Sequence, residues 1–259
     1  MENIITSKDN PIIKLYQKLS SSKKERIQYG LFVLEGLRIT EDALRESHVS
    51  NLIFTENAYK KYSSQLFQAD LKDTKTIVIS NELGKKISST DTTQGVFAIC
   101  NIPVQKIPVF SDNCKYIVLY GLQDCGNVGM IIRTADALGI DGIILSGSCD
   151  LYSPKVIRST MGSVFRTNIF IENDTEKLFS LLKNNNVTTS AGVIDGETFV
   201  TECDFLGKHA IFIGNEGNGL PREVSQRCDR RITIPMKGSI NSLNAGMASG
   251  ILMWEMKKY

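Results

Sequence analysis

The chain has 259 residues, of which 42% are hydrophobic and 22% are charged, and its formal net charge is +2. This composition is typical of a globular protein and excludes a disordered chain, a collagen and a coiled coil. No apolar run reaches the roughly 18 to 20 residues that span a bilayer, and the first residues lack the basic flank and apolar stretch of a signal peptide. We therefore expect a cytoplasmic protein.

The six cysteines are scattered along the chain without a C-x-x-C pair, and only two histidines accompany them. This pattern predicts neither a disulfide framework nor a zinc site. We expect reduced and mostly buried thiols, and no bound metal.

Basic residues are concentrated near the N-terminus. Residues 1–110 contain 15 basic and 12 acidic side chains, whereas residues 111–259 contain 15 and 16. The segment from Lys8 to Arg26 alone has six basic side chains against two acidic ones. Such a segment could follow a phosphate backbone or form the solvated face of a helix, and charge alone does not separate the two.

The first hundred residues alternate between helical and strand-like segments. Asn10-Pro11 is typical of a helix start, and apolar residues then recur at helical spacing at Ile12, Leu15, Tyr16 and Leu19. The predicted strands are 31–34, 51–54, 76–79 and 95–99, and the predicted helices between them are 36–47, 57–68 and 81–88. This alternation predicts a compact α/β sandwich. Two prolines within residues 101–108 predict an extended linker, so we place a first domain at 1–108 and a second at 109–259.

The second domain alternates in the same way. Its predicted strands are 115–120, 142–146, 167–171, 188–193, 210–213 and 231–234, and its predicted helices are 127–138, 153–160, 174–184, 220–226 and 241–257. The series predicts a mostly parallel sheet covered on both faces, with a ligand at the carboxyl ends of the strands.

The first of three unusual segments runs from Gly121 to Asp136. An apolar stripe at helical spacing begins at Val128, so Asn127 stands where a helix cap is expected and Arg133 lies off the buried stripe. Taken alone, these two residues are an ordinary cap and an ordinary surface cation.

The second segment is a buried-type strand that leads into Gly214-Asn215-Glu216-Gly217-Asn218-Gly219-Leu220-Pro221. Glycines allow a close approach of the backbone to a ligand. The spacing G-x-x-G-x-G is neither the dinucleotide fingerprint nor a Walker loop. A plain turn is the alternative, although a single carboxylate among glycines is unusual for one.

The third segment runs from Ile232 to Gly250. A strand ends at Ile234, a glycine-bearing loop follows, and Asn241 or Ser242 is expected to cap a helix. The predicted apolar stripe of this helix is Leu243, Met247, Gly250 and Trp254. Gly246 and Gly250 favour close packing in a soluble core or a subunit interface.

Together and in this order, the three segments resemble the signature motifs of the SpoU (TrmH) family of RNA 2′-O-ribose methyltransferases, a branch of the SPOUT superfamily. The resemblance rests on Asn127, Gly129 and Arg133, on Gly214-Asn215-Glu216-Gly217-x-Gly219-Leu220, on Ile234-Pro235-Met236-x-Gly238, and on Ser242-Leu243-Asn244. The front of the chain looks like the ribosomal-protein-like RNA-binding domain that many members carry, with Asn10-Pro11, Lys14, Phe32, Glu35-Gly36 and Gln94-Gly95-Val96.

The resemblance implies a C-terminal α/β methyltransferase domain tied in a trefoil knot, a smaller N-terminal α/β sandwich domain that binds RNA, and S-adenosylmethionine bound in the knot. General topology rules alone predict an unknotted sheet. The resemblance also implies a homodimer, in which Arg133 works either on its own cofactor site or on that of its partner. The chain departs from the family pattern at Ala245-Gly246, where valine and serine are usual, but the replacements are also small.

The resemblance assigns roles to individual residues. Expected cofactor contacts are Gly214, Ile234, Met236, Leu243 and Asn244, and the expected catalytic set is Arg133, Asn127, Glu216, Ser242 and Asn244. A guanidinium is not deprotonated in proteins, so we expect Arg133 to hold the neighbouring phosphate or to stabilise the developing oxyanion. We expect Asn127 to orient Arg133 or the ribose, Glu216 to hold the arginine, and Ser242 and Asn244 to position substrate and cofactor. The expected RNA contacts are Lys14, Lys18, Lys23, Lys24 and Arg26.

Two other classes of protein compete with the enzyme. The same fold could serve as an RNA-binding module without chemistry, although the presence of the whole catalytic set favours the enzyme. A nicotinamide-dependent oxidoreductase is excluded because the glycine spacing is wrong and no acidic residue follows at the ribose-recognition distance. The front domain favours ribosomal over transfer RNA as the substrate.

Overall fold

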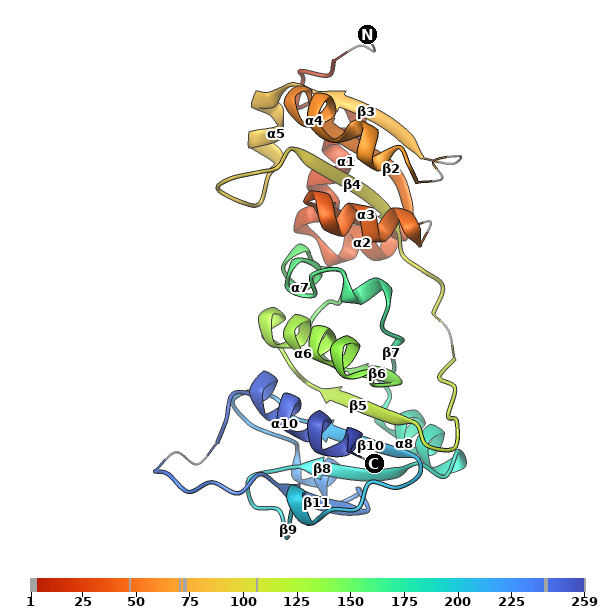
Figure 1. Cartoon of the computed structure of the whole chain (residues 1–259), viewed down its shortest axis with the longest axis vertical. Coiled ribbons are helices and arrows are strands. Elements are labelled where there is room, and N and C mark those ends of the chain that lie inside the picture. The colour runs from red at the N-terminus through yellow and green to blue at the C-terminus, as the bar shows by residue number, and fades with distance from the viewer. Residues whose placement is uncertain are drawn as a thin grey trace. The chain divides into compact units, whose positions relative to one another are not determined.

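The computed structural model describes residues 4–46, 48–69, 71, 74–105, 107–239 and 242–258. Contacts between Cα atoms divide the chain into two compact units, which can be followed by colour in Figure 1. Unit 1 contains the chain up to Val104 together with Asp150–Phe165, and unit 2 contains Gln105–Cys149 and Arg166–Tyr259. Residues 150–165 therefore fold with the first part of the chain, which a division at residue 108 does not anticipate.

Unit 1 is a mixed α/β unit. Its elements are α1 (Pro11–Ser21), α2 (Lys23–Tyr29), β1 (Leu31–Glu35), α3 (Leu37–Arg45), β2 (Val49–Thr55), α4 (Glu56–Leu66), β3 (Lys75–Ile79), α5 (Asn81–Ile87), β4 (Val96–Asn101), α7 (Pro154–Ser159) and a 3₁₀ turn (Ser163–Phe165). The sheet order is β1-β4-β2-β3, with β2 and β3 parallel and the other pairs antiparallel. Asn10 caps α1 as predicted, whereas α2 was not predicted as a separate helix.

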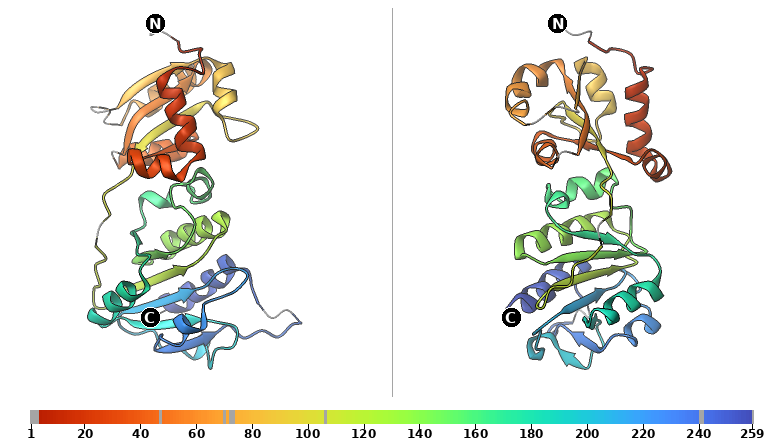
Figure 2. Two further views of the ribbon diagram at one scale, coloured as in Figure 1. Left: turned by 180° about the vertical axis from the view of Figure 1, so that it is seen from behind. Right: turned by 90° about the vertical axis from the view of Figure 1, so that its right-hand side faces the viewer.

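Alternate residues of each strand in unit 1 face opposite sides of the sheet. Phe32 and Leu34 are buried with residues of α3, α4 and α7, whereas Val33 is buried with residues of α1 and α5 on the other side. Figure 2 shows helices on both sides of this sheet. The predicted α/β sandwich is therefore confirmed for unit 1.

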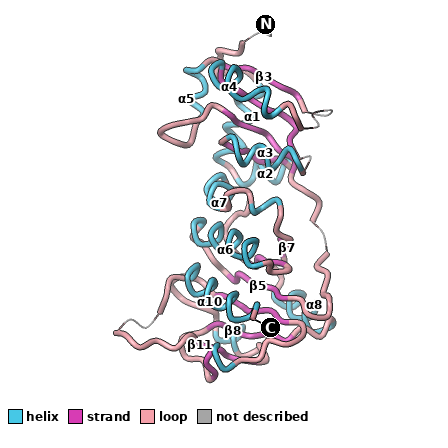
Figure 3. The backbone as a smooth tube through the Cα atoms, in the orientation of Figure 1, coloured by secondary structure: helices cyan, strands magenta, loops and turns pink. Residues whose placement is uncertain are grey.

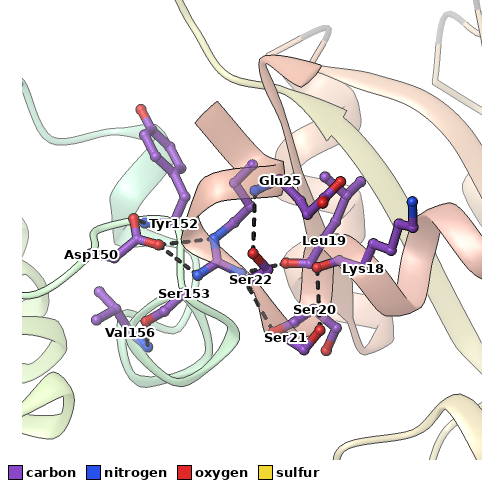
Figure 4. A network of polar contacts seen from close by, with 11 residues as sticks. Lys18, Leu19, Ser20, Ser21, Ser22, Glu25, Asp150, Tyr152, Ser153 and Val156 are labelled. Atoms are coloured by element: carbon purple, nitrogen blue, oxygen red, sulfur yellow. Dashed lines mark hydrogen bonds and ion pairs between the residues drawn. The ribbon is translucent and has the colours of Figure 1, made fainter. Parts of the chain in front are cut away.

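The segment 150–165 is built into the core of unit 1. Ile157 is buried in the same cluster as Phe32, and the ring of Phe32 lies 4.9 Å from that of Tyr152, centroid to centroid. Arg26 holds the start of the segment, because its Nε and Nη2 atoms donate to Oδ2 of Asp150 at 2.8 and 2.6 Å (Figure 4). The guanidinium of Arg26 also donates to the carbonyl of Leu19, and its side chain is only 6% exposed. Removing either charge of this shielded pair would leave the other buried and uncompensated.

Unit 2 contains the larger sheet. Its elements are β5 (Lys115–Tyr120), α6 (Cys125–Leu138), β6 (Gly142–Ser146), β7 (Ile169–Ile171), α8 (Thr175–Asn184), β8 (Thr188–Gly192), β9 (Thr198–Phe199), a 3₁₀ turn (Val200–Glu202), β10 (His209–Ile213), α9 (Arg222–Ser225), β11 (Arg230–Thr233) and α10 (Ala245–Lys257). The strand order is β7-β6-β5-β10-β8-β11-β9, and every neighbouring pair is parallel.

Helices cover both faces of the sheet in unit 2. Helices α6 and α10 pack together on one face, and α8 and α9 lie on the other (Figure 2). The predicted parallel sheet covered on both sides is confirmed. None of the described helices is both long and apolar enough to cross a membrane.

Several element boundaries differ from the prediction. Helix α6 begins at Cys125 and is capped by Asp124 instead of Asn127, and α10 is capped by Asn244 instead of Ser242. The other predicted cap, Asn241, lies outside the described residues. The proline-bearing stretch has no helix or strand at 102–105 and 107–114, and Figure 3 draws it as loop.

A buried lysine and a buried histidine stand side by side at the start of β5 and β10. Lys115 and His209 are paired across the two strands, and both are almost inaccessible to water. Nζ of Lys115 donates to Oδ1 of Asn113 and to the carbonyls of Phe205 and Gly207 at 2.5–2.7 Å. Burial, aided by the positive charges of Arg230 and Lys115, lowers the pKa of His209 to about 4.

We expect the free energy of unfolding to decrease as the pH falls. The imidazole of His209 is neutral in the folded chain and regains an ordinary pKa near 6.5 on unfolding, so its contribution is complete above that pH and is lost toward pH 4. Between pH 8 and pH 5 the loss due to this residue is about 2 kcal/mol. Urea unfolding of the wild type and of His209→Gln at both pH values measures it. Identical pH dependence in the two proteins would contradict the assignment.

Candidate active site

A cavity of about 530 Å³ opens in unit 2 at the carboxyl ends of β8, β10 and β11. Its walls come from residues 192–195, 213–220 and 232–236 without Pro235, from the two residues before Asn244, and from Ala245, Ala248 and Leu252 of α10. The three strands are neighbours in a parallel register, so their carboxyl ends meet at one edge. Parallel α/β sheets bind ligands at this edge.

The cavity brings together most of the residues predicted from the motifs. Four of the five expected cofactor residues line it: Gly214, Ile234, Met236 and Leu243. Glu216 and Ser242 of the expected catalytic set line it as well. Asn244 is not among the lining residues, because its side chain caps α10 by accepting from the N–H groups of Gly246 and Met247.

The loop after β10 turns back on itself so tightly that it requires glycine at its start. The backbones of Asn215 and Gly219 are paired by two hydrogen bonds of 2.9 and 3.1 Å. A Cβ atom on Gly214 would lie 2.2 Å from the backbone carbon of Gly219 and from the nitrogen of Leu220. Backbone atoms cannot move aside as a flexible side chain can, so any larger residue at position 214 would reshape the cavity wall.

Two side-chain hydrogen bonds link the three motif segments. Nδ2 of Asn127 donates to Oε1 of Glu216 at 3.1 Å, and Nδ2 of Asn244 donates to Oδ1 of Asn127 at 3.0 Å. The carboxylate of Glu216 also accepts from the backbone N–H groups of Gln123 and Asp124. Asn127 therefore joins the loop after β10 to the start of α10, while Glu216 holds the turn before α6.

These contacts determine the charge state of Glu216. Partial burial by itself would raise the pKa of this carboxyl group. Hydrogen bonds from its own N–H, from the amide of Asn127 and from the two N–H groups before α6 outweigh burial and lower the pKa below its ordinary value. Glu216 is consequently an anion at neutral pH.

Arg133 is not part of this network in its own chain. It is exposed on α6 and does not line the cavity. Within the described part of the chain, its guanidinium makes no hydrogen bond or ion pair. The expected contacts of Arg133 with Asn127 and Glu216 are therefore not formed within one chain, because both of those side chains point toward the loops that they connect.

The chemistry of the cavity wall is apolar and acidic. Two carboxylates line it, those of Asp195 and Glu216, and no lysine, arginine or histidine does so among the described residues. An ion pair of 2.7 Å with Arg231 lowers the pKa of Asp195, so this group is also ionised. Glycine backbone and aliphatic side chains form most of the remaining wall. Such a cavity suits a ligand with a flat ring, several hydrogen-bonding groups and a positive charge.

Three contributors to the site have no role among the residues assigned from the motifs. Residues 193–195 follow β8 and line the cavity, Asp124 caps α6, and Asn215 ties its loop to the carbonyl of Gly121. Asp195-Gly196 after a predicted strand is a turn signal that could have drawn attention to the first of these. The sequence alone did not reveal that β8 neighbours β10 and β11.

The apolar stripe predicted for the last helix faces outward. Met247 and Trp254 are each 58% exposed, and Met130 of the adjacent α6 is 39% exposed. The buried side of α10 is instead formed by Gly246, Ser249, Leu252, Met253 and Met256. Gly246 lies against Met130, so the small residue allows α10 to approach α6 closely.

The basic residues of α1 and α2 divide into three groups. Lys18, Lys23 and Lys24 are exposed, and no carboxylate of a described residue lies within ion-pair distance of them. Lys14 is also exposed but pairs with Asp9 at 2.8 Å. Arg26 is buried and bound to Asp150, so it does not offer its charge to a polyanion, and the expectation of an RNA contact at this residue does not fit the structure.

The sequence model of the SpoU rRNA methylase family matches residues 115–254. The chain belongs to this family. A second model, the MRM3-like substrate binding domain, matches residues 10–98. Together the two matches span both units of this SpoU-family chain.

Full-length relatives support the same assignment. The chain is 27% identical to the 23S rRNA (guanosine(2553)-2′-O)-methyltransferase RlmP of Bacillus subtilis over 98% of each chain. The AdoMet-bound rRNA methyltransferase of Sinorhizobium meliloti superposes with a TM-score of 0.89 at 29% identity, covering 99% of this chain and 97% of that one. The SpoU methyltransferase AviRb of Streptomyces viridochromogenes in complex with AdoMet gives 0.89 at 25% identity, with 96% and 97% covered.

We expect Asn127 and Glu216 to be energetically coupled. Replacing either with alanine removes the same hydrogen bond, so the double variant should lose less stability than the two single variants together, by about 1 kcal/mol. Urea unfolding of the four proteins gives this coupling. A parallel cycle between Asn127→Ala and Asn218→Ala, whose side chains make no mutual hydrogen bond, should give none. Equal coupling in both cycles would show that the link between the segments is not the one described.

Proposed function

We propose that this SpoU-family protein transfers a methyl group from S-adenosylmethionine to a ribose 2′-hydroxyl of ribosomal RNA. The observation that carries the proposal is the cavity at the carboxyl edge of the parallel sheet, which the second and third motif segments line and to which the first is linked through Asn127. The full-length similarity to a 23S rRNA 2′-O-methyltransferase supports the reaction and the class of RNA.

The cavity wall fits the cofactor. S-adenosylmethionine supplies a methyl group on a positively charged sulfur, and the carboxylate of Glu216 favours a cation at this edge. The carboxylate of Asp195 is already paired with Arg231. Ile234, Leu243 and Leu252 offer an apolar slot for adenine, and the glycine-rich backbone offers donors and acceptors for its polar edge. AdoMet-bound structures of two similar proteins support this assignment.

The protein's own residues have two tasks in such a transfer. They must hold the ribose oxygen in line with the methyl group, and they must favour loss of the hydroxyl proton. We assign Arg133 to the neighbouring phosphate or the developing oxyanion, where a permanent cation stabilises negative charge. Ser242 lines the cavity and positions the ribose, while Asn127, Glu216 and Asn244 keep the three loops in register.

We further propose that the chain acts as a homodimer with the C-terminal segment tied in a trefoil knot, and that Arg133 enters the cavity of the partner subunit. Its absence from the cavity of its own chain supports this arrangement. So does the outward-facing apolar surface of α6 and α10, because Met130, Met247 and Trp254 would lose their exposure in such a contact.

The two family models support separate functions for the two parts of the chain. We propose that residues 1–108 bind RNA and that residues 109–259 bind the cofactor, with residues 150–165 of the latter stretch folded into unit 1. Lys14, Lys18, Lys23 and Lys24 are the proposed phosphate contacts of α1 and α2, and Arg26 is left out. A protein that modifies ribosomal RNA works in the cytoplasm, which is where we place it.

Methyl transfer to ribosomal RNA tests the function directly. Wild-type protein should incorporate label from S-adenosylmethionine into 23S rRNA at a ribose 2′-oxygen, and Arg133→Ala should be at least about 100-fold slower. Calorimetric binding of S-adenosylmethionine should be unchanged in that variant. Cofactor binding and RNA binding without any methyl transfer would instead identify a non-catalytic RNA-binding module.

Mixing two inactive variants distinguishes the two placements of Arg133. If the arginine works across the dimer, Arg133→Ala mixed with the cavity variant Gly214→Ala should recover activity. The mixed dimer then has one intact cavity facing one intact arginine. No recovery in dimers shown to exchange subunits would mean that Arg133 serves its own cavity.

The single tryptophan reports on the dimer. Trp254 is 58% exposed in the isolated chain, so its emission should shift to the red on dilution if dimers separate. Trp254→Arg should place a charge in the contact and give a monomer by light scattering. Tyr29 is an exposed aromatic residue of unit 1, so Tyr29→Arg serves as the matched control and should leave the dimer intact. A monomeric wild type would contradict the proposed assembly.

A further inference from the structure

We propose that α7 contributes a second RNA-contact surface to unit 1, formed by Arg158 and Lys155. The proposal rests on the proposed function, in which unit 1 holds ribosomal RNA. Neither residue belongs to the motifs or to the basic stretch at the N-terminus. Both come from the methyltransferase half of the sequence, but they fold with the first unit because residues 150–165 do so.

The position of α7 places Arg158 beside the basic helices. The residues that line a small pocket in unit 1 include Ser20 of α1 and Arg158 of α7. Lys23 and Lys24 follow Ser20 within four residues and are exposed. The buried pair of Arg26 and Asp150 joins α2 to the stretch that leads into α7, and Figure 4 draws the contacts at Asp150 as dashed lines. A phosphate backbone that follows α1 and α2 therefore reaches α7 without leaving unit 1.

A short relay of hydrogen bonds fixes the guanidinium of Arg158. Its Nη1 atom donates to Oγ of Ser89 at 3.0 Å, and that hydroxyl donates to Oε2 of Glu35 at 2.6 Å. The same carboxylate accepts further bonds from the N–H of Ser89 and from two more hydroxyls, those of Ser88 and Thr90. Glu35 is thus occupied in shaping the loop 88–90, and the arginine is oriented through a neutral hydroxyl.

Arg158 differs in this respect from the arginines of the chain that an acidic side chain holds in place. Arg26, Arg166, Arg227 and Arg231 each have a carboxylate oxygen within 3 Å. Arg158 has none within ion-pair distance in the described residues, and it is exposed. An oriented guanidinium whose remaining N–H donors face solvent can bind a phosphate through two parallel hydrogen bonds.

Lys155 extends the same surface. It lies three residues before Arg158 on α7, so the two side chains project from neighbouring positions on the helix. Lys155 is exposed, and no described carboxylate pairs with it. Two cations at this spacing, in the same unit as the lysines of α2, fit a polyanion such as the RNA backbone better than a single small anion.

Salt-dependent binding of a 23S rRNA transcript to the full-length protein tests the proposal. Arg158→Gln and Lys155→Gln should each weaken binding about threefold to tenfold and reduce the slope of log affinity against log salt by about one. Ser89→Ala should weaken binding about twofold to threefold with an unchanged slope, because the charge remains but its orientation is lost. Arg45→Gln, an exposed arginine of unit 1 paired with Asp42, should change neither quantity.

Binding of S-adenosylmethionine and the thermal unfolding midpoint serve as folding controls for all four variants. If Arg158→Gln does not fold, Arg158→Lys provides the measurement, with the slope retained and affinity reduced. Unchanged RNA affinity in the α7 variants, with weaker binding in Lys23→Gln and Lys24→Gln, would overturn the inference while leaving the proposed function intact. A wild-type protein that neither binds nor methylates ribosomal RNA would overturn both.

Discussion

The carboxamide of Asn127 is the point on which the candidate site depends. It donates to Glu216 and accepts from Asn244, and these partners lie 89 and 117 residues away in the sequence. Only a side chain that is both donor and acceptor can make the two bonds at once. An aspartate at this position would face the carboxylate of Glu216 with a like charge, and an alanine would remove both bonds and the link between the segments. This one amide therefore holds the loop after β10 and the loop before α10 against the start of α6, and residues of both loops line the cavity.

The sequence predicted the elements better than their connections. Apolar periodicity located most helices and strands, and the alternation of the two was enough to predict a parallel sheet in the second unit. Strand order was not predictable, because β10 lies between β5 and β8 although it follows both in the chain. The site forms at that junction, so the motifs indicated which residues matter without showing which of them touch.

Two local errors share a cause. Asp124 and Asn127 are both residues that cap helices, and they stand three positions apart, so the pattern alone could not choose between them. In the structure Asp124 takes the cap by accepting from the N–H of Asn127, which frees the amide of Asn127 for the loops. Likewise Arg26 belongs to a basic run, but its partner Asp150 is 124 residues away and turns it into the core. Long-range partners decide the role of a polar residue, and periodicity carries no information about them.

The charged groups that line the cavity do not by themselves favour RNA. Two carboxylates line the wall and no described cation does. Asp195 is paired with Arg231, but the carboxylate of Glu216 has no such partner among the described residues. It favours a sulfonium ligand and repels the phosphates that must approach to bring a ribose oxygen next to it. In the proposed arrangement the cations that hold the phosphates come from outside the wall: Arg133 from a second subunit, and the lysines of unit 1 together with Arg158. On this view the acidic cavity holds the cationic methyl donor, and the basic surfaces of the protein hold the anionic RNA that accepts the methyl group. Both are needed because the donor and the acceptor carry opposite charges.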